Sequence, residues 1–134
     1  MKLIIRETGY AVAALCLLAK DRHKKVAVSE LARKMKISRH FLRKIMQLLN
    51  KQGVVSSFKG QGGGFLLAKA PNKISLIDLI KLFQGPIKFR ECSFKRQLCP
   101  NIKNCKLKRK VDNIQQYVLA ELKNITLESL LKGK

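Results

Sequence analysis

The sequence predicts a mainly α-helical fold with one small β-hairpin, and two observations support this. Apolar residues recur at spacings of three and four over most of the chain, as they do on one face of an α-helix. A glycine-rich stretch, residues 59–63, separates two short runs of β-branched and apolar residues, which is typical of a hairpin. The length of 134 residues suits one compact domain with one appended element.

Capping residues set the expected element boundaries. Ser29, Ser38, Ser75 and Thr126 each precede a helical pattern, and their hydroxyls can accept hydrogen bonds from amides of the first turn. Gly53 stands where a helix ends, because glycine enters the left-handed conformation without penalty. In chain order, the expected helices cover residues 7–20, 30–35, 39–52, 76–83, 107–125 and 127–131, and the expected strands cover 54–58 and 64–67.

The charge of the chain is strongly unbalanced. Lys and Arg number 29 against 8 Asp and Glu, a formal net charge of +21. Such an excess draws a protein toward a polyanion, with nucleic acid the first candidate and an anionic membrane surface the second. We expect no membrane span, because no apolar run reaches about 18 residues. Glu7 interrupts the apolar N-terminal stretch, so we expect an amphipathic helix and a cytoplasmic protein rather than a signal peptide.

The order helix, short helix, tight turn, helix, hairpin is that of a winged helix-turn-helix, in which the second helix of the motif enters the DNA major groove. The segment 38–52 suits this helix, because apolar and polar residues separate onto two faces. The expected buried stripe contains Phe41, Leu42, Ile45, Leu48 and Leu49. The starting turns and the opposite face carry Ser38, Arg39, His40, Arg43, Lys44 and Gln47.

Candidate DNA contacts follow from these positions. Ser38, Arg39 and His40 lie at the helix N-terminus, where an Arg can bind guanine O6 and N7. Lys44 and Lys51 suit phosphate contacts, which add affinity without sequence information. The small hairpin tip can approach the DNA backbone or minor groove. The full set of expected DNA-binding residues is Ser29, Ser38, Arg39, His40, Arg43, Lys44, Lys59 and Gln61.

Three cysteines, Cys92, Cys99 and Cys105, form a C-x6-C-x5-C pattern in an aperiodic stretch before the long helix. Thiolates are the usual ligands of iron–sulfur clusters, and the neighbouring lysines and arginine would offset the negative charge of a cluster. Zinc bound by three thiolates and another ligand, or three free thiols, remain alternatives. Cys16 lies on the apolar face of the first helix and is expected in the core.

The sequence resembles the bacterial winged-helix transcriptional regulators that include IscR, NsrR and CymR. The resemblance covers nearly the whole chain. It is carried by residues 10–12, 29–32, 37–38, 53–55, 59–68 and 125–127, of which the wing Lys59-Gly-Gln-Gly-Gly-Gly-Phe65-Leu-Leu-Ala68 is the most specific. Some members have Glu where this chain has Arg43, so their operator preferences are not carried over.

The resemblance implies a homodimer that binds double-stranded DNA at an inverted-repeat operator, with the long helix pairing across the two-fold axis. The seam Leu107, Val111, Ile114, Val118, Leu122 and Ile125 suits such pairing, although it could pack within one subunit instead. The resemblance also implies an iron–sulfur cluster, [2Fe-2S] or [4Fe-4S], on the three cysteines. Where members supply a fourth ligand, this chain has Gly9 and Lys108, which leaves Glu7, Glu91 or a small exogenous ligand.

We therefore expect three parts: a DNA-binding domain at 1–86, a cysteine-containing loop at 87–105, and a dimerisation helix with a short last helix at 106–134. The expected function is repression of transcription, adjusted by a cluster that senses redox state, nitric oxide or iron–sulfur status. The alternatives are a cluster-free regulator that answers to a protein partner or metabolite, and a non-specific architectural DNA binder. An enzyme is not expected, because paired catalytic carboxylates and a Cys-x-x-Cys motif are absent from the sequence.

Overall fold

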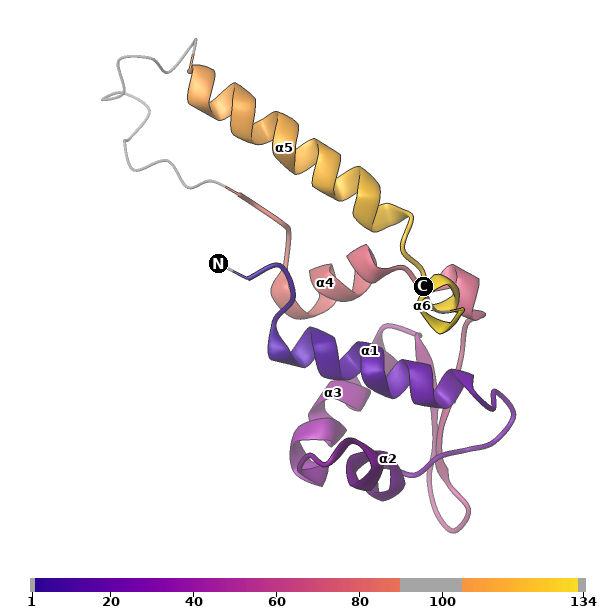
Figure 1. The fold of residues 1–134 in the computed structure, drawn as a ribbon. Helices are drawn as coiled ribbons and strands as arrows, with labels where there is room; N and C mark the ends of the chain where they lie inside the picture. The colour runs from indigo at the N-terminus through magenta and orange to yellow at the C-terminus, as the bar shows by residue number, and fades with distance from the viewer. Residues whose placement is uncertain (1, 90–104, 133–134) are drawn as a thin grey trace.

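The computed structural model describes residues 2–89 and 105–132 (Figure 1). In chain order its elements are α1 (Arg6–Ala19), α2 (Val28–Met35), α3 (Arg39–Lys51), β1 (Val55–Phe58), β2 (Gly64–Leu67), the 3-10 turn η1 (Pro71–Lys73), α4 (Leu76–Gln84), α5 (Lys106–Lys123) and α6 (Leu127–Leu131). The two strands form an antiparallel hairpin. The predicted fold class, mainly helical with one hairpin and a long C-terminal helix, is confirmed.

The core lies around α1. Ala11, Ala14, Leu15 and Leu18 are fully or almost fully buried along one face of this helix. That face contacts α3, α4, α6 and β2, so one helix joins the helix-turn-helix, the hairpin and the C-terminal part of the described chain. The small side chains of the alanines let these neighbours approach closely, as dense packing of a protein interior requires.

Three of the four predicted N-caps are confirmed. Ser38 Oγ accepts a hydrogen bond from the amide of Phe41 at 3.2 Å, and Ser75 Oγ caps α4 in the same way at 3.3 Å. Thr126 and Ser129 form a reciprocal capping box at the start of α6. Each cap satisfies a helix amide that would otherwise lack a partner.

The prediction that Ser29 caps α2 is wrong. Val26 pairs with Phe65 of the hairpin through two backbone hydrogen bonds of 3.1 and 2.9 Å, so the chain is extended up to Ala27. The helix then begins at Val28 with Ala27 as its N-cap, which places Ser29 inside the first turn. Tertiary pairing with the hairpin therefore overrides the local capping preference.

Within residues 2–89 and 105–132, no helix has both the length and the apolar content needed to cross a bilayer.

Candidate nucleic-acid interface

The two faces of α3 differ sharply in exposure. Leu42, Ile45, Met46 and Leu49 are buried, and these positions follow the i, i+3, i+4, i+7 spacing of one helix face. The predicted stripe is wrong at Leu48, which is 42% exposed, because it lies at the edge of this face while Met46 occupies the centre. Phe41 is half-buried and makes an edge-to-face contact with Tyr10 of α1, with ring centroids 5.5 Å apart.

The outer face of α3 is polar and basic. Arg39, His40, Arg43 and Lys44 are all exposed on its first two turns. The tight turn before the helix depends on Lys36, whose φ of 58° is left-handed and reverses the chain between α2 and α3. The structure thus brings four of the predicted DNA-binding residues together on one surface, which we call the recognition face.

The hairpin forms a wing beside this helix-turn-helix. Its tip, residues 59–63, turns through Gly60 and Gly62, whose φ values of 88° and 75° are left-handed. A Cβ on Gly63 would lie 2.3 Å from the carbonyl oxygen of Phe58, so this position has no room for a larger residue. Lys59 and Gln61, both predicted to contact DNA, are exposed at the tip.

The wing is held against the rest of the domain at two places. The Val26–Phe65 pairing ties β2, one residue from its tip end, to the loop before α2. Nearer the tip, the Lys25 ammonium lies 4.3 Å from the centroid of the Phe58 ring, a cation–π contact. Neither contact could be expected from the sequence, because each joins residues more than 30 positions apart that carry no local signal.

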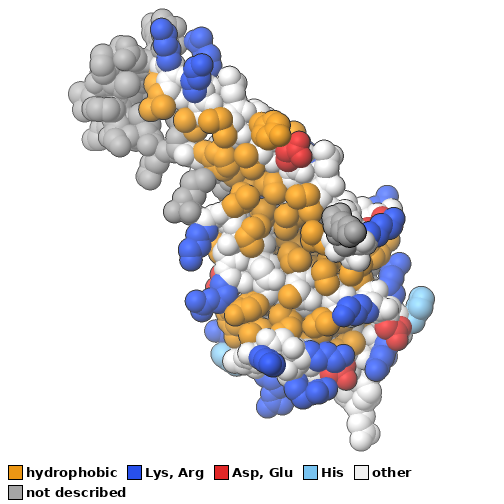
Figure 2. Space-filling view, viewed as in Figure 1, with side chains coloured by type: hydrophobic (Ala, Val, Ile, Leu, Met, Phe, Trp, Pro, Cys, Tyr) orange, Lys and Arg blue, Asp and Glu red, His pale blue; other side chains and the backbone are white. Residues whose placement is uncertain are grey.

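The recognition face and the wing tip lie at the same end of the molecule. In Figure 1 the start of α3 and the tip of the hairpin both lie at the lower end, away from α5. Figure 2 shows Lys and Arg side chains gathered at this lower end and again at the start of α5, while an apolar band runs along α5 toward α1. Part of the positive charge of the chain is therefore displayed where the helix and the wing could meet one DNA duplex.

The apolar seam of α5 divides into two parts. Leu122 is buried in a cluster with Ile77 and Ile80 of α4, so this end packs within the subunit. Toward the start of the helix, Leu107 is 72% and Ile114 is 56% exposed. Tyr117, which lies outside the predicted seam, is 67% exposed on the same helix. These exposed apolar and aromatic side chains make this part of α5 a candidate surface for contact with another chain.

The N-terminal segment is fixed by one glutamine at the end of α4. Gln84 Oε1 accepts from the Ile5 amide at 3.0 Å and from the Thr8 hydroxyl at 2.9 Å. Its Nε2 donates to the carbonyl oxygens of Lys2 and Leu3. Glu7, the candidate fourth ligand, is half-buried in the first turn of α1, within the segment that Gln84 holds.

Of the three candidate metal ligands, the structure describes Cys105. This half-buried residue is the N-cap of α5, and its Sγ accepts a hydrogen bond from the Lys108 amide at 3.4 Å. Cys92 and Cys99, together with Glu91, lie outside the described residues. Within 2–89 and 105–132, no three His, Cys, Asp or Glu side chains gather into a metal-binding group.

Cys16 of α1, expected in the core, is half-buried and packs against the core from its edge. Burial raises the pKa of its thiol, and the positive charge of nearby Lys20 offsets this in part. The thiolate is the metal-binding and reactive form, and burial disfavours that form at Cys16.

A basic helix on a helix-turn-helix frame with a wing beside it defines a winged-helix DNA-binding regulator. The model of the Rrf2 family, described as an iron-dependent transcriptional regulator, matches residues 4–133. The chain belongs to the Rrf2 family of transcriptional regulators and, as predicted, is not an enzyme.

Similar proteins agree with this assignment. A protein of Aquifex aeolicus (strain VF5), described as an HTH-type transcriptional regulator, is 38% identical over 124 residues, which is 91% of this chain and 86% of that protein. The structure of CymR, the global cysteine regulator of B. subtilis, superimposes with a TM-score of 0.80 at 25% identity, over 100% of this chain and 99% of that one. T. potens IscR has a TM-score of 0.73 at 26% identity, over 98% and 87% of the two chains.

Proposed function

We propose that this transcriptional regulator acts in the cytoplasm as a homodimeric repressor of an inverted-repeat operator, and that the cysteine segment adjusts its DNA affinity. The recognition face is the main observation that supports sequence-specific DNA binding. Arg39, His40, Arg43 and Lys44 are exposed while the opposite face of α3 is in the core. With Ser38 at the N-cap, Arg39 can donate two parallel hydrogen bonds to a guanine, and His40 and Arg43 can reach neighbouring bases.

Other residues serve affinity rather than sequence reading. Lys44 lies further along α3 and suits a phosphate oxygen, as Lys59 does at the wing tip. Gln61 is exposed at the tip between two glycines, so it can approach the DNA backbone or the minor groove. Ser29 is exposed in the first turn of α2. Its hydroxyl can donate a hydrogen bond to a phosphate oxygen, which the N-terminus of the helix also attracts.

Dimerisation through α5 would present two recognition faces from one symmetric frame. The exposed side chains of Leu107, Ile114 and Tyr117 lie along the part of α5 that does not pack on α4. Pairing α5 with its copy would remove these apolar groups from water. Two recognition helices related by a two-fold axis bind half-sites about one helical turn apart.

The described part of the cysteine segment fits a thiolate-ligated iron–sulfur cluster. The Cys105 sulfur accepts an amide hydrogen bond at the start of an 18-residue helix, where the helix dipole favours negative charge. Lys106, Lys108 and Arg109 follow it and are exposed, so they can offset the charge of an anionic cluster. Cys92, Cys99 and Cys105 would hold the cluster, and Glu7 is the candidate fourth ligand. A bound cluster would supply a centre that oxidants or nitric oxide modify.

The position of Cys105 explains how the cysteine segment can act on DNA binding. Cys105 immediately precedes α5, so a change in what its sulfur binds acts on the first turn of the dimerisation helix. A shift of that turn would alter how the two copies of α5 pair, and hence the spacing of the recognition helices. A coupling free energy of about 1–3 kcal/mol would change DNA affinity by roughly 5- to 150-fold.

Anaerobic purification, absorption spectroscopy and quantitation of iron and sulfide test for the cluster. We expect a coloured protein with iron and acid-labile sulfide in comparable amounts. The variant with Cys92, Cys99 and Cys105 all replaced by Ala should be colourless, whereas Cys16→Ala should keep the cluster. If the wild type and the triple variant bind DNA with equal affinity, before and after cluster reconstitution, sensing through the cysteine segment is wrong.

The role of Glu7 has its own test. We expect Glu7→Ala to change the visible spectrum of the reconstituted protein or to speed cluster loss, and Glu7→Asp to show a smaller change. A spectrum and a cluster lifetime that are both unchanged in Glu7→Ala would exclude Glu7 as a ligand.

A cluster-free regulator of the same fold is the second candidate. The similarity to CymR, described as a cysteine regulator, favours it. In that case the purified protein would contain neither iron nor sulfide under anaerobic conditions, and its DNA affinity would respond instead to a metabolite or protein partner.

A further inference from the structure

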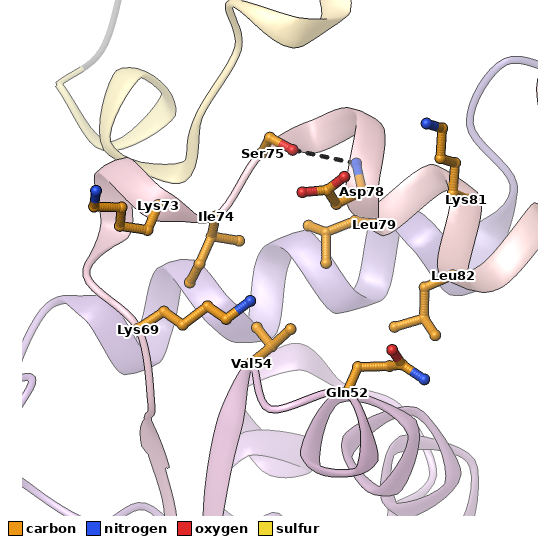
Figure 3. A pocket seen from close by; sticks show the side chains of 10 residues that line it. All are labelled: Gln52, Val54, Lys69, Lys73, Ile74, Ser75, Asp78, Leu79, Lys81 and Leu82. Carbon is orange, nitrogen blue, oxygen red and sulfur yellow. Dashed lines mark hydrogen bonds between the residues drawn. The ribbon is translucent and has the colours of Figure 1, made fainter.

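A hollow of about 460 Å³ lies between the end of α3, the start of the hairpin and α4 (Figure 3). Gln52, the C-cap of α3, lies at one side of it, and Val54 at the entry to β1 forms part of its wall. Since an α-helix rises 1.5 Å per residue, Gln52 lies about 20 Å along the helix axis from Arg39 and about 12 Å from Lys44. The site is therefore separate from the recognition face.

The inner wall of the hollow is apolar. Val54, Ile74 and Leu79 belong to the buried core, and Leu82 packs partly buried against it. Each presents aliphatic carbon to the hollow (Figure 3). An apolar part of a ligand placed there would cover this surface and gain the free energy of removing it from water.

The rim of the hollow is mainly cationic. Lys69, Lys73 and Lys81 line it together with a single carboxylate, Asp78. In Figure 3 the Lys69 side chain extends over Val54 into the hollow, while Asp78 lies on the side of Ser75. Among the residues that the structure describes, no carboxylate lies within ion-pair distance of Lys69. Its ammonium group is thus directed over apolar surface, and none of the described carboxylates pairs with it.

The lysines, and not the start of α4, supply the affinity for an anion. Two of the first amides of α4 already have partners, because the Asp78 amide donates to Ser75 Oγ and the Leu76 amide donates to the Ile125 carbonyl at 2.9 Å. An anionic group would therefore pair first with Lys69, whose side chain extends into the hollow (Figure 3). Lys73 lies at the rim with its ammonium group directed outward, so this exposed side chain would have to turn inward to reach the same anion.

We propose that this hollow binds a small carboxylate with an apolar body. The carboxylate pairs with Lys69 and, once that side chain turns inward, with Lys73, and the apolar body lies on Val54, Ile74 and Leu79. The volume falls in the range of about 300–1,000 Å³ that small-molecule sites occupy. An apolar wall beside a few convergent polar groups is the usual composition of such sites.

A ligand in the hollow would also contact the elements that position the DNA-binding surface. This coupling to DNA affinity rests on the proposed function, DNA binding by the chain. It contacts the end of α3, the entry to the wing and α4 at once, so it favours one relative placement of α3 and the hairpin. Binding changes operator affinity only if the site differs between the free and DNA-bound forms. Ligand binding itself does not depend on this coupling and is measured without DNA.

The test titrates the ¹⁵N-labelled full-length protein with hexanoate and, separately, with hexylammonium and inorganic phosphate. We expect hexanoate to shift the backbone amide signals of Gln52, Lys69, Ile74 and Leu82 in a saturable way. Hexylammonium shares the apolar body but not the charge, and phosphate shares the charge but not the body, so both should produce much smaller shifts. Equal shifts from either probe, or no saturable shift from hexanoate, would overturn the proposal.

A matched pair of double variants locates the site. Lys69→Gln with Lys73→Gln should weaken hexanoate binding by about fivefold, as expected for two partly exposed ion pairs. Lys20→Gln with Lys123→Gln removes the same charge from exposed lysines outside the hollow and should leave affinity unchanged. All four positions are exposed, so the variants should fold, and the unshifted remainder of the amide spectrum verifies it. Equal affinities of the two variants would contradict the assignment.

Discussion

Replacing Lys59 by Gln at the wing tip tests how this surface engages DNA. Lys59 is exposed, it begins the tip, and its side chain makes no ion pair among the residues that the structure describes. Gln keeps much of the length of the side chain and removes the charge. Because its neighbours Phe58 and Gly60 set the turn, the fold of the wing should not change.

The expected magnitude follows from counterion release. Each phosphate contact contributes about 0.9 to the slope of log affinity against log salt concentration, and a dimer loses two contacts, or about 1.8 in slope. Between about 50 and 200 mM salt, this difference corresponds to about a 12-fold smaller loss of affinity in the variant than in the wild type. The affinity lost through the Lys59→Gln substitution at one salt concentration should be similar for all DNA sequences, because phosphate contacts carry no base information.

Fluorescence anisotropy with a labelled duplex, measured at several salt concentrations, gives the slope directly. Lys123→Gln is the control, since Lys123 is exposed at the end of α5 and loses the same formal charge. If Lys59→Gln has the wild-type slope, or if Lys123→Gln lowers the slope equally, the wing tip does not contact phosphate and the reasoning is refuted.

Three further predictions concern the frame that carries the site. Gly64→Ala would place a Cβ 2.6 Å from the Val26 carbonyl group in the loop before α2, and should lower the free energy of unfolding by at least about 2 kcal/mol. Gly62→Ala would place its Cβ in open space and should lower this free energy less, which urea titration of both variants measures. Gln84→Ala leaves the buried Thr8 hydroxyl without its acceptor and should cost about 1–3 kcal/mol, with faster amide exchange in residues 2–8; unchanged exchange there would contradict the role of Gln84. Because burial raises the pKa of Cys16, its alkylation by iodoacetamide at mildly alkaline pH should be slower in the folded protein than after unfolding, as peptide mass spectrometry can measure; equal rates would contradict the burial.

Local chemistry explains which parts of the fold could be predicted from sequence. Ser38, Ser75 and Thr126 cap helices as expected, because each hydroxyl acts on an amide three residues away. Gly53 follows α3 with a φ of 77°, as expected for the residue after a helix end. These features depend on a few neighbouring residues, so their signals survive in a single sequence.

Features that depend on distant segments could not be predicted in the same way. Ser29 has every property of an N-cap, yet pairing between Val26 and the hairpin moves the start of α2. Gln84 has no local pattern, and its function becomes visible only when the end of α4 lies beside the N-terminal segment.

In the candidate site too, features set by neighbouring residues could be predicted, and features set by distant segments could not. The amphipathic pattern of α3 identified the recognition face, because helical geometry alone determines which side chains share a side. The division of the α5 seam did not follow from its spacing. Leu122 packs on α4 while Ile114 remains exposed, and only the position of α4 in three dimensions distinguishes the two.

In vitro selection from a pool of random duplexes tests the central claim most directly, because it assumes no operator. If a dimer presents Ser38 to Lys44 to base edges twice, the enriched sequences should contain two inverted half-sites with centres about 10 base pairs apart, and Arg39→Ala should relax the preference at one base pair of each half-site. Enrichment of sequences without two-fold symmetry, or no enrichment at all, would contradict the account.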